Sequence, residues 1–352
     1  MKEQQLYEII ARIAPMNVMA MEASEQYSNT LTKPPGSLGK LEAIARQAAG
    51  ITGELAPDWS RRAVIVMAGD HGVCEEGVSA FPAEVTPQMV ANFLAGGAAV
   101  NVLARQAGAD VYCVDVGVNA ELADHPSLRR CKVRPGTANM ARGAAMERTE
   151  ALQAIAAGIA IVDELADKGY RLFATGEMGI GNTTASAALC TVLANITAED
   201  AVGLGTGISE AARKHKIEVV QRAIAVNEPD VADVLGTLAK LGGLEIAGLA
   251  GVIIGAASRG CPVVIDGFIA SAAALVAGKL APAAIPYMLA SHLSHEQGHR
   301  KLLAAIGLSP MIHLDMRLGE GTGAVLCFHF IDAALLIMRE MATFESAGVS
   351  NQ

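Results

Sequence analysis

Two glutamates of the chain stand beside glycines in short runs that are typical of turns facing a ligand. Glu177 lies in the run 175–184 (TGEMGIGNTT), and Glu320 lies in the run 317–324 (RLGEGTGA). Glycine neighbours leave a carboxylate uncovered and let a ligand approach the backbone closely. Either run alone also fits an ordinary loop. Because both follow probable strands, together they favour an active site with two carboxylates.

The Glu177 run precedes a probable helix, so the amides near the helix start can point toward one anion, and a phosphate is the natural ligand. The run is not a P-loop, since no lysine precedes its threonines, and its glycine spacing differs from the dinucleotide-binding pattern. The alternative is a tight turn whose Asn182 or Thr183 only caps the helix. The phosphate- or ribose-binding candidates in this run are Gly176, Gly179, Gly181, Asn182 and Thr183.

A second glycine-rich run, at 203–207 (GLGTG), precedes a probable helix that carries four basic residues at 213–216 (RKHK). Two such runs strengthen the interpretation as an anion site. For each basic residue taken singly, a solvated helix face is the alternative. Lys216 is the candidate because it lies one turn deeper into the helix beside the loop, where a point charge can reach a phosphate. The binding candidates from this region are Gly205, Thr206, Gly207 and Lys216.

The segment 291–299 (SHLSHEQGH) contains H-E-x-x-H, the pattern of zinc peptidases, formed by His295, Glu296 and His299. Glu320 is a third candidate ligand for such a metal. However, Gly298 falls within the turn that must hold both histidines on one helix face, which costs about 1 kcal/mol of helix preference. A zinc hydrolase is therefore the main alternative. Ser291 and Ser294, near a helix start, are instead candidate ligands of the substrate phosphate.

Two further segments carry side chains with chemical potential. Asp70 and His71 follow a probable strand and suit either an acid–base pair or the fixing of a turn. The segment 33–42 (KPPGSLGKLE) joins a stiff Pro-Pro turn to a helix start capped by Ser37. Capping is the simpler interpretation of this segment, and covering an anionic substrate is the functional one.

The elements that must position these groups alternate short apolar runs with helical patterns, which predicts a parallel sheet. The strand candidates are nearly all apolar, as strands buried on both faces are. They are 63–68, 111–116, 171–175, 262–265 and 311–314, and the helix candidates between them are 87–106, 149–168, 183–193, 209–227, 231–238 and 268–279. The chemical runs follow the strands, where an open parallel sheet forms its ligand crevice. Helical patterns at 1–30 and 325–345 predict a small lobe built from both ends.

The composition narrows the class of protein. The 352 residues are 52% hydrophobic but only 4% aromatic, which favours closely packed helices over a core of large rings. The net charge is −9 with no basic stripe, so nucleic acid is not an expected partner. Six dispersed cysteines without a C-x-x-C pair predict reduced thiols and a cytoplasmic location. We expect no signal peptide, and the apolar stretch 244–257 is too short and too rich in glycine for a membrane span.

Six motifs in one order make the chain similar to the nicotinate-nucleotide:dimethylbenzimidazole phosphoribosyltransferase family of cobalamin lower-ligand biosynthesis. They are KPPGSLGKLE at 33–42, GDHGVCEEGV at 69–78, GEMGIGNTT at 176–184, DGF at 266–268, SHLSHEQGH at 291–299 and RLGEGTGA at 317–324. The resemblance implies a Rossmann-like parallel sheet flanked by helices. It implies a large α/β catalytic domain at 31–324, a helical lobe made of 1–30 and 325–352, and a homodimer.

The resemblance also implies the reaction and the roles in it. The 5-phosphoribosyl group of nicotinate mononucleotide passes to 5,6-dimethylbenzimidazole, giving α-ribazole 5′-phosphate and nicotinate, without a cofactor or a metal. Glu320 matches the general base of the family, Glu177 a second active-site carboxylate, and Lys216 the lysine after the second glycine loop. Because the leaving pyridinium is already cationic, the reaction needs a base and no general acid. Glu177 is then expected to stabilise positive charge on the sugar or to orient the ribose hydroxyls.

The pocket for the acceptor base is where the chain departs from the family. Phe81 stands where a small polar residue is expected, and Met89 where a glutamine can occur. An apolar pocket still stacks a benzimidazole, so the pocket candidates are Phe81, Met89 and Met178. The departures leave other benzimidazoles, purines and phenols open as acceptors.

Overall fold

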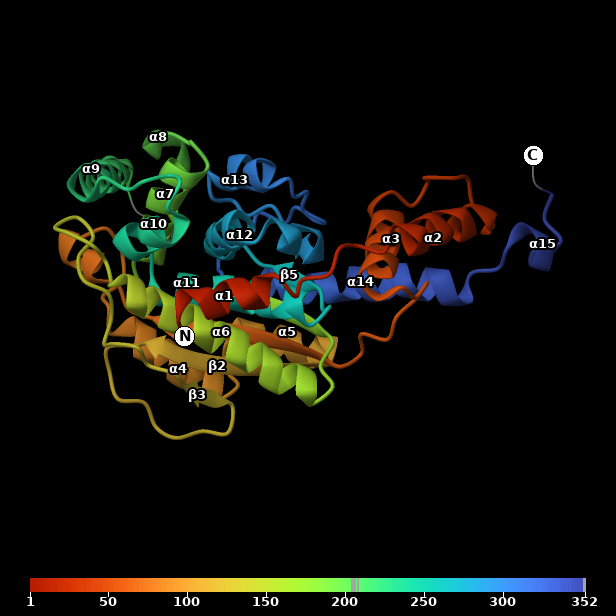
Figure 1. Cartoon of the computed structure of the whole chain (residues 1–352), viewed down its shortest axis with the longest axis horizontal. Coiled ribbons are helices and arrows are strands. Elements are labelled where there is room, and N and C mark those ends of the chain that lie inside the picture. The colour runs from red at the N-terminus through yellow and green to blue at the C-terminus, as the bar shows by residue number, and fades with distance from the viewer. Residues whose placement is uncertain (204–206, 208, 351–352) are drawn as a thin grey trace.

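The computed structural model, in which residues 1–203, 207 and 209–350 are described, contains one sheet of six parallel strands (Figure 1). The strands are β1 (Arg62–Gly69), β2 (Ala109–Gly117), β3 (Leu128–Arg130), β4 (Leu172–Met178), β5 (Val263–Ile265) and β6 (Met288–Ala290). Their order in the sheet is β3-β2-β1-β4-β5-β6. This is the order of a doubly wound Rossmann-like sheet, so the predicted fold class is confirmed.

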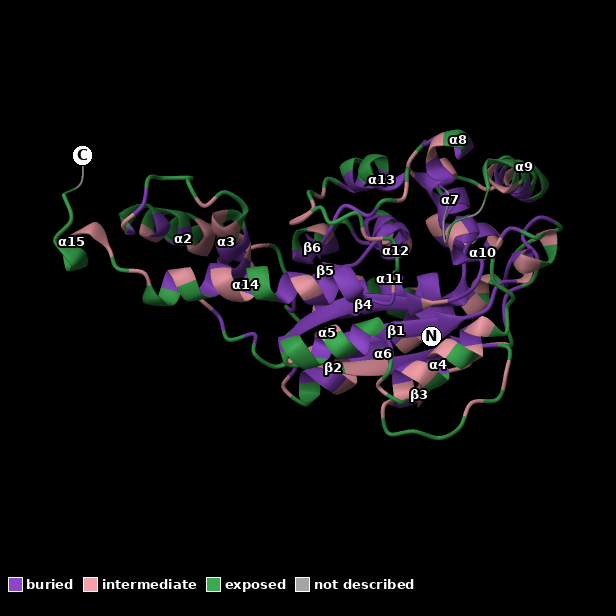
Figure 2. Ribbon diagram, turned by 180° about the vertical axis from the view of Figure 1, so that it is seen from behind, coloured by how far each residue is buried: buried purple, intermediate pink, exposed green. Residues whose placement is uncertain are grey.

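The sheet separates two apolar layers, and β1 contributes to both. Ala63, Ile65 and Met67 point into one layer, whereas Val64 and Val66 point into the other. Helices α6 (Arg148–Asp167), α7 (Asn182–Leu193), α10 (Val234–Leu241), α11 (Leu244–Ser258) and α12 (Phe268–Leu280) build the first layer. Helices α4 (Val85–Leu94), α5 (Ala99–Ala107) and α14 (Thr322–Glu340) build the second, and α3 (Lys40–Thr52) extends it by packing on α14. The strands are therefore buried on both faces, as Figure 2 shows.

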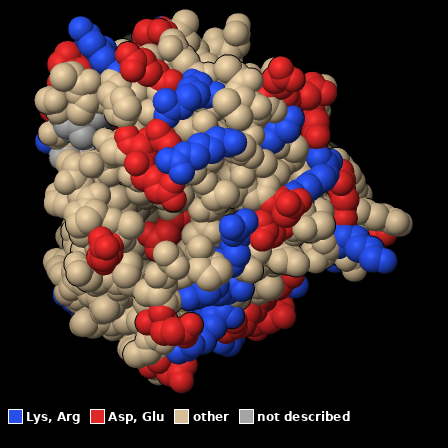
Figure 3. All heavy atoms as spheres, turned by 90° about the vertical axis from the view of Figure 1, so that its left-hand side faces the viewer, with Lys and Arg blue, Asp and Glu red and all other residues tan. Residues whose placement is uncertain are grey.

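The other short elements connect or cover these layers. They are η1 (Gly72–Glu76), α8 (Ala198–Ala201), α9 (Glu210–Asn227), η2 (Pro282–Tyr287) and α13 (His299–Ile306). On the face that carries α9, acidic and basic side chains are interspersed (Figure 3), and pairs such as Arg222–Glu76 and Arg213–Glu210 link them. Among the described residues of this face, both signs of charge alternate.

Helix α11 is the apolar stretch that resembles a membrane span in the sequence. Every residue in 244–257 is buried. The helix packs so closely on α6 that a Cβ at Gly158 would collide with the carbonyl oxygen of Gly248. The predicted buried helix is confirmed. The low aromatic content of the chain reflects such close contacts between helices.

A lobe of helices stands away from the sheet (Figure 1). It contains α2 (Val18–Thr30), α3, the far end of α14 and the terminal α15 (Phe344–Ala347). An antiparallel bridge between Leu31 and Thr343 joins its two chain segments. Helix α1 (Glu3–Ile10) instead packs on α11. The division into 31–324 and a lobe of 1–30 with 325–352 stays a prediction, because close packing alone does not establish independent units.

Two of the element predictions are wrong in detail, and two strands have no prediction. The apolar run 311–314 is not a strand, since Ile312 forms only an isolated bridge with His292, and the edge of the sheet is β6. Strands β3 and β6 have no sequence prediction. The helix predicted at 87–106 is divided into α4 and α5 because Gly96 adopts a positive φ of 76° between them.

One helix among the described residues, α14, is long and apolar enough to cross a membrane by length and composition. Its first turns lie under the sheet, where Val325, Cys327 and Phe328 are fully buried. Its Asp332 pairs with Arg62 of β1 at 2.9 Å. These contacts are those of a core helix.

Candidate active site

The site lies where the sheet order reverses. Strands β1 and β4 are neighbours there, although the chain between them first forms β2 and β3 on the far side. In sheets of this kind the crevice outside the carboxyl ends of such strands holds the ligand. A cavity of about 340 Å³ lies at this edge. Its lining includes Phe81, Met89, Glu177, Met178, Gly179, Asn182, Thr183, Asp266, His292, Arg317 and Glu320.

The two glycine–glutamate turns interlock. A Cβ at Gly176 would collide with the carbonyl oxygen of Glu320, and a Cβ at Gly319 would collide with the carboxylate of Glu177. Each turn therefore has glycine where the glutamate of the other turn passes. The glycines serve contact between the turns, where the sequence suggests room for a ligand. The consequence is that both carboxylates reach one cavity.

Glu177 is enclosed by protein on the last residues of β4. The Nδ2 of Asn182 and the main-chain amide of Glu320 donate hydrogen bonds to its carboxylate. Burial raises the pKa of Glu177 to about 8, and the charges of Asp266 and Glu245 add to this shift. The two hydrogen bonds oppose it. This shift favours the protonated form of Glu177 at neutral pH.

The backbone conformation at Glu320 differs from that at Glu177. Its φ of 64° lies in the left-handed region, between Gly319 at 85° and Gly321 at 97°. Its Oε2 accepts a long hydrogen bond of 3.4 Å from the Val100 amide at the start of α5. Burial raises the pKa of Glu320, and the Asp266 charge adds to this shift while the Val100 amide opposes it. A carboxylate made more basic in this way suits a proton acceptor.

The glycine-rich run after β4 divides into lining and packing residues. Gly179, Asn182 and Thr183 line the cavity at the start of α7. Gly181 does not line it: it has a φ of 94°, and a Cβ there would press on the Cys74 thiol. Gly176 packs against the main chain of Glu320. Of the five predicted contacts, three face the cavity and two shape the backbone.

Lys216 reaches this run from α9. Its Nζ donates to the Thr183 hydroxyl at 2.6 Å, although Lys216 itself does not line the cavity. Burial lowers the pKa of Lys216 to about 8, while the charges of Glu296 and Cys74 oppose the shift. A buried cation next to a helix start gains most from an anionic ligand. Its placement supports a phosphate near Thr183.

The other predicted phosphate ligands are less direct. Gly205 and Thr206 lie outside the described residues, and Gly207 is an exposed turn residue with a φ of 106°. Ser291 is fully buried and does not line the cavity. Its hydroxyl donates to the Asp266 carbonyl at 3.2 Å and lies 3.0 Å from Nδ1 of His292. Ser291 thus supports residues that do line it.

All three predicted base-pocket residues line the cavity. Phe81 precedes α4 and is 49% exposed, so its ring stands at the mouth. Met89 projects from α4, and Met178 ends β4. With Val85 and Leu318 they form the apolar wall of the cavity. Such a wall can stack a flat heterocycle.

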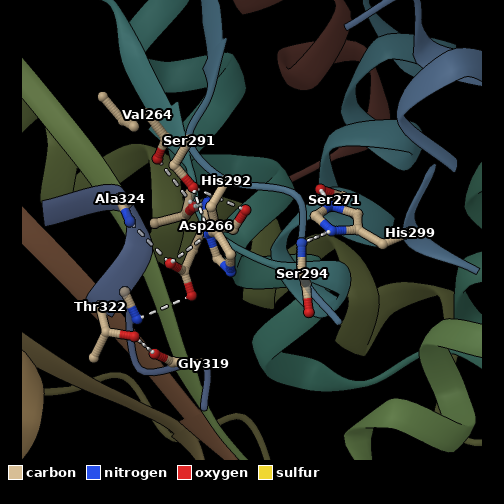
Figure 4. A network of polar contacts seen from close by, with 12 residues as sticks. Val264, Asp266, Ser271, Ser291, His292, Ser294, His299, Gly319, Thr322 and Ala324 are labelled. Carbon is tan, nitrogen blue, oxygen red and sulfur yellow. Dashed lines mark hydrogen bonds and ion pairs between the residues drawn. The ribbon is translucent and has the colours of Figure 1, made fainter. Parts of the chain in front are cut away.

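Several lining residues have no role predicted from the sequence. Asp266 follows β5, His292 follows β6, and Arg317 precedes the Glu320 turn. Asp266 and His292 belong to the motifs DGF and SHLSHEQGH, so their position after strands is the available signal. Asp266 is joined by hydrogen bonds to Gly321, Ala324 and Ser291 (Figure 4).

The H-E-x-x-H segment does not have the geometry of a metal site. It is not helical before His299, so His295 and His299 do not share a helix face. Ser271 and the Ser294 amide occupy both ring nitrogens of His299 (Figure 4), and burial lowers its pKa to about 3. Among the described residues no group of three or more His, Cys, Asp or Glu is arranged to hold a metal ion. This arrangement contradicts the zinc hydrolase alternative.

Asp70 and His71 lie behind the site. The Nε2 of His71 and Oε1 of Glu245 are 2.6 Å apart in a fully buried pair. Burial alone would lower the pKa of His71, but the charges of Glu245 and Asp70 more than offset this. A Cβ at Gly179 would touch the His71 ring. The His71–Glu245 pair therefore packs against the glycine run at Gly179.

Comparisons with known proteins agree with this geometry. A family model described as "Phosphoribosyltransferase" matches residues 13–349. The nicotinate-nucleotide–dimethylbenzimidazole phosphoribosyltransferase of Chlorobium chlorochromatii is 54% identical over all of this chain and 99% of the relative. The protein of the same name from Chloroflexus aggregans is 53% identical over 99% of this chain and 98% of its own. The crystal structure of the Thermus thermophilus enzyme of that name is 46% identical with a TM-score of 0.91, covering 96% of this chain and 100% of that one.

Proposed function

The chain belongs to the phosphoribosyltransferase family that these comparisons define, and on that basis we propose the reaction it catalyses. The 5-phosphoribosyl group of nicotinate mononucleotide passes to 5,6-dimethylbenzimidazole, giving α-ribazole 5′-phosphate and nicotinate. The observation that carries the proposal is that Glu177 and Glu320, from interlocked turns, line one cavity with an apolar wall. A flat base and a sugar phosphate both find suitable chemistry there.

The chemistry of the substrate sets what the protein must supply. As the ribosyl C1′–N bond breaks, its electron pair returns to the cationic pyridinium nitrogen, so nicotinate leaves without a proton. A benzimidazole nitrogen forms the new bond to C1′, and the hydrogen on its other nitrogen becomes acidic. Glu320 accepts that proton. The raised pKa of Glu320 makes its carboxylate a better acceptor.

Glu177 acts on the sugar side in this proposal. Two roles suit a carboxyl there, namely stabilisation of positive charge and orientation of the ribose hydroxyls. Because burial raises the pKa of Glu177 to about 8, the protonated form dominates at neutral pH and favours the second role. Asn182 fixes the carboxyl from the start of α7.

The phosphate is assigned to the start of α7. The amide groups there carry the positive end of the helix dipole. Lys216 supplies a full charge beside Thr183. Inversion from the β to the α anomer requires the attacking and leaving rings on opposite sides of the ribose. The phosphate site anchors the sugar between them.

The test is turnover with defined substrates. Purified protein is incubated with nicotinate mononucleotide and 5,6-dimethylbenzimidazole, and products are identified by mass spectrometry. We expect equal amounts of nicotinate and α-ribazole 5′-phosphate. A panel with other benzimidazoles, purines and phenols identifies the preferred acceptor. Binding of the nucleotide without release of nicotinate would reduce the protein to a binding module.

Assembly and location are proposed with the activity. We propose a homodimer, supported by the apolar Phe330 and Leu336 that α14 leaves 40% and 41% exposed. Sedimentation of the purified protein at several concentrations tests this. We also propose a cytoplasmic location, supported by six cysteines that are all free. Cell fractionation tests that proposal.

A further inference from the structure

Asp266 lies between β5 and α12 at the centre of the polar network in Figure 4. It is only 2% exposed. Its amide donates to the Thr175 hydroxyl at 3.0 Å, and its carbonyl accepts from the Ser291 hydroxyl at 3.2 Å. The backbone of Asp266 is therefore fixed from β4 on one side and from the segment after β6 on the other.

The carboxylate of Asp266 receives the first amides of α14. Its Oδ2 accepts from the Gly321 amide at 3.2 Å, and its Oδ1 accepts from the Ala324 amide at 3.0 Å. Gly321 directly follows Glu320. Both hydrogen bonds therefore fix the chain immediately after the proposed general base.

The Glu320 turn needs such support because its backbone is unfavourable. Residues other than glycine rarely adopt a φ of 64°. The Thr322 hydroxyl donates to the Gly319 carbonyl at 2.8 Å and closes the turn on itself. The bonds to Asp266 tie this turn to the sheet.

Asp266 also interacts electrostatically with titratable groups of the cavity. The titratable groups that face it are Glu177, His292, Glu320 and Cys327. The Nδ1 of His292 lies 4.0 Å from Oδ1 of Asp266. Burial raises the pKa of Asp266 itself, whereas the charge of His292 and the amides of Ala324, Gly267 and Gly321 oppose this shift and favour the ionised form. In that form the charge of Asp266 contributes to the raised pKa of Glu320, in addition to the larger contribution of burial.

We propose that Asp266 is a positioning residue of the transfer reaction. It clamps the start of α14 so that Glu320 faces the cavity, and its charge keeps the Glu320 carboxylate a good proton acceptor. Asp266 works through Glu320 and takes no proton from the substrate itself. This inference rests on the proposed function, in which Glu320 is the base.

The test combines Asp266→Asn with Glu320→Gln. Asparagine loses the charge and one of the two acceptors for the α14 amides. We expect Asp266→Asn to lower kcat by about tenfold or more. Residues that act as one unit have non-additive effects, so the double variant should be no slower than Glu320→Gln alone. Multiplied losses in the double variant would overturn the proposal.

The pH profile separates clamping from charge. Removing a neighbouring negative charge makes Glu320 easier to ionise, so the acidic limb of kcat/KM should move to lower pH in Asp266→Asn. If Asp266 had a purely structural role, Asp266→Asn would lower the rate and leave the acidic limb of kcat/KM at its wild-type pH. That result would overturn the claim that the charge of Asp266 acts on Glu320. Near-normal kcat would overturn the clamp.

Two variants keep the result interpretable. Asp332→Asn makes the same chemical change on α14, at an ion pair with Arg62 that lies away from the cavity. This variant should have the wild-type kcat and the wild-type position of the acidic limb of kcat/KM. If Asp266→Asn does not fold, Asp266→Ser retains one acceptor of the kind that caps helices and carries the same expectations. Absence of nicotinate release by the wild type would instead refute the proposed function.

Discussion

The two interlocked turns place the same side chain in one cavity by different means. The turn at the end of β4 keeps ordinary strand backbone and buries Glu177 against Asn182, so burial sets the state of the acid. The turn before α14 forces Glu320 into a left-handed backbone and supports it with Asp266. Burial raises the pKa of both carboxyls, so the contrast lies in how each is held: Glu177 by a side chain packed against it, and Glu320 by an unusual backbone conformation. It predicts that substitution of Glu320 lowers kcat by a different factor from substitution of Glu177.

The largest effect should come from Glu320→Gln. The amide cannot accept the benzimidazole proton, so kcat should fall by ~100-fold or more, measured by nicotinate release under saturating substrates. The melting temperature should stay close to that of the wild type. Glu340→Gln, an exposed glutamate at the end of α14, is the matched control. Near-wild-type turnover of the Glu320 variant would mean that Glu320 is not the general base, and the two turns would then not differ in the way described.

Lys216→Ala should weaken nucleotide binding at the turn that follows β4 and leave the Glu320 turn unaffected. Losing a buried cation beside Thr183 should raise KM for nicotinate mononucleotide by about tenfold or more and change KM for the base little. Initial rates with each substrate varied in turn measure both constants. Lys214→Ala, two residues away and exposed, serves as control. An unchanged KM for the nucleotide would argue against a phosphate at this turn.

Glu177→Gln should cost less than Glu320→Gln, roughly tenfold at most in kcat, because glutamine resembles the protonated acid. The pH dependence of stability sharpens this. Between the ordinary pKa of a glutamate and about 8, the folded protein holds a proton on Glu177 that the unfolded chain releases. The wild type should therefore lose stability as pH rises through this window.

Thermal melts across that window provide the measurement. The melting temperature of Glu177→Gln, relative to the wild type, should increase from the acidic to the alkaline end. A constant difference would mean that Glu177 is already ionised in the folded protein. The comparison between the two turns would then lose its basis.

The smallest effect should come from Phe81→Ser, which lies outside both turns. Removing the ring at the mouth of the cavity should change KM among acceptor bases by roughly tenfold or less and leave KM for nicotinate mononucleotide unchanged. A competition assay with paired bases measures the preference. A change in the nucleotide KM would place Phe81 on the sugar side.

The sequence predicts the parts of this architecture that depend on local pattern. Apolar runs predict β1, β2, β4 and β5, and the glycine-flanked Glu177 and Glu320 are recognisable because turn chemistry is local. The run 311–314 is as strand-like in sequence as β6 is. Pairing with β5, a contact between distant segments, decides the edge of the sheet.

Roles that depend on tertiary contact are beyond the sequence. Gly176 and Gly319 suggest room for a ligand, whereas each one faces the other turn. Nothing near Asp266 in the chain indicates that its carboxylate receives the amides of Gly321 and Ala324. His299 resembles a metal ligand in the sequence because its partners Ser271 and Ser294 are recognisable only in the folded protein.

The position of Glu320 at the start of α14 has a consequence for protein synthesis. A ribosome extends the chain from the N-terminus, so β1 to β4 and the run that ends at Thr184 emerge well before α14. Under the proposed function, a polypeptide that ends before α14 would therefore contain the sugar-phosphate loop and lack the proton acceptor. We therefore expect competence for chemistry only after α14 has been synthesised and packs against the sheet that earlier residues form.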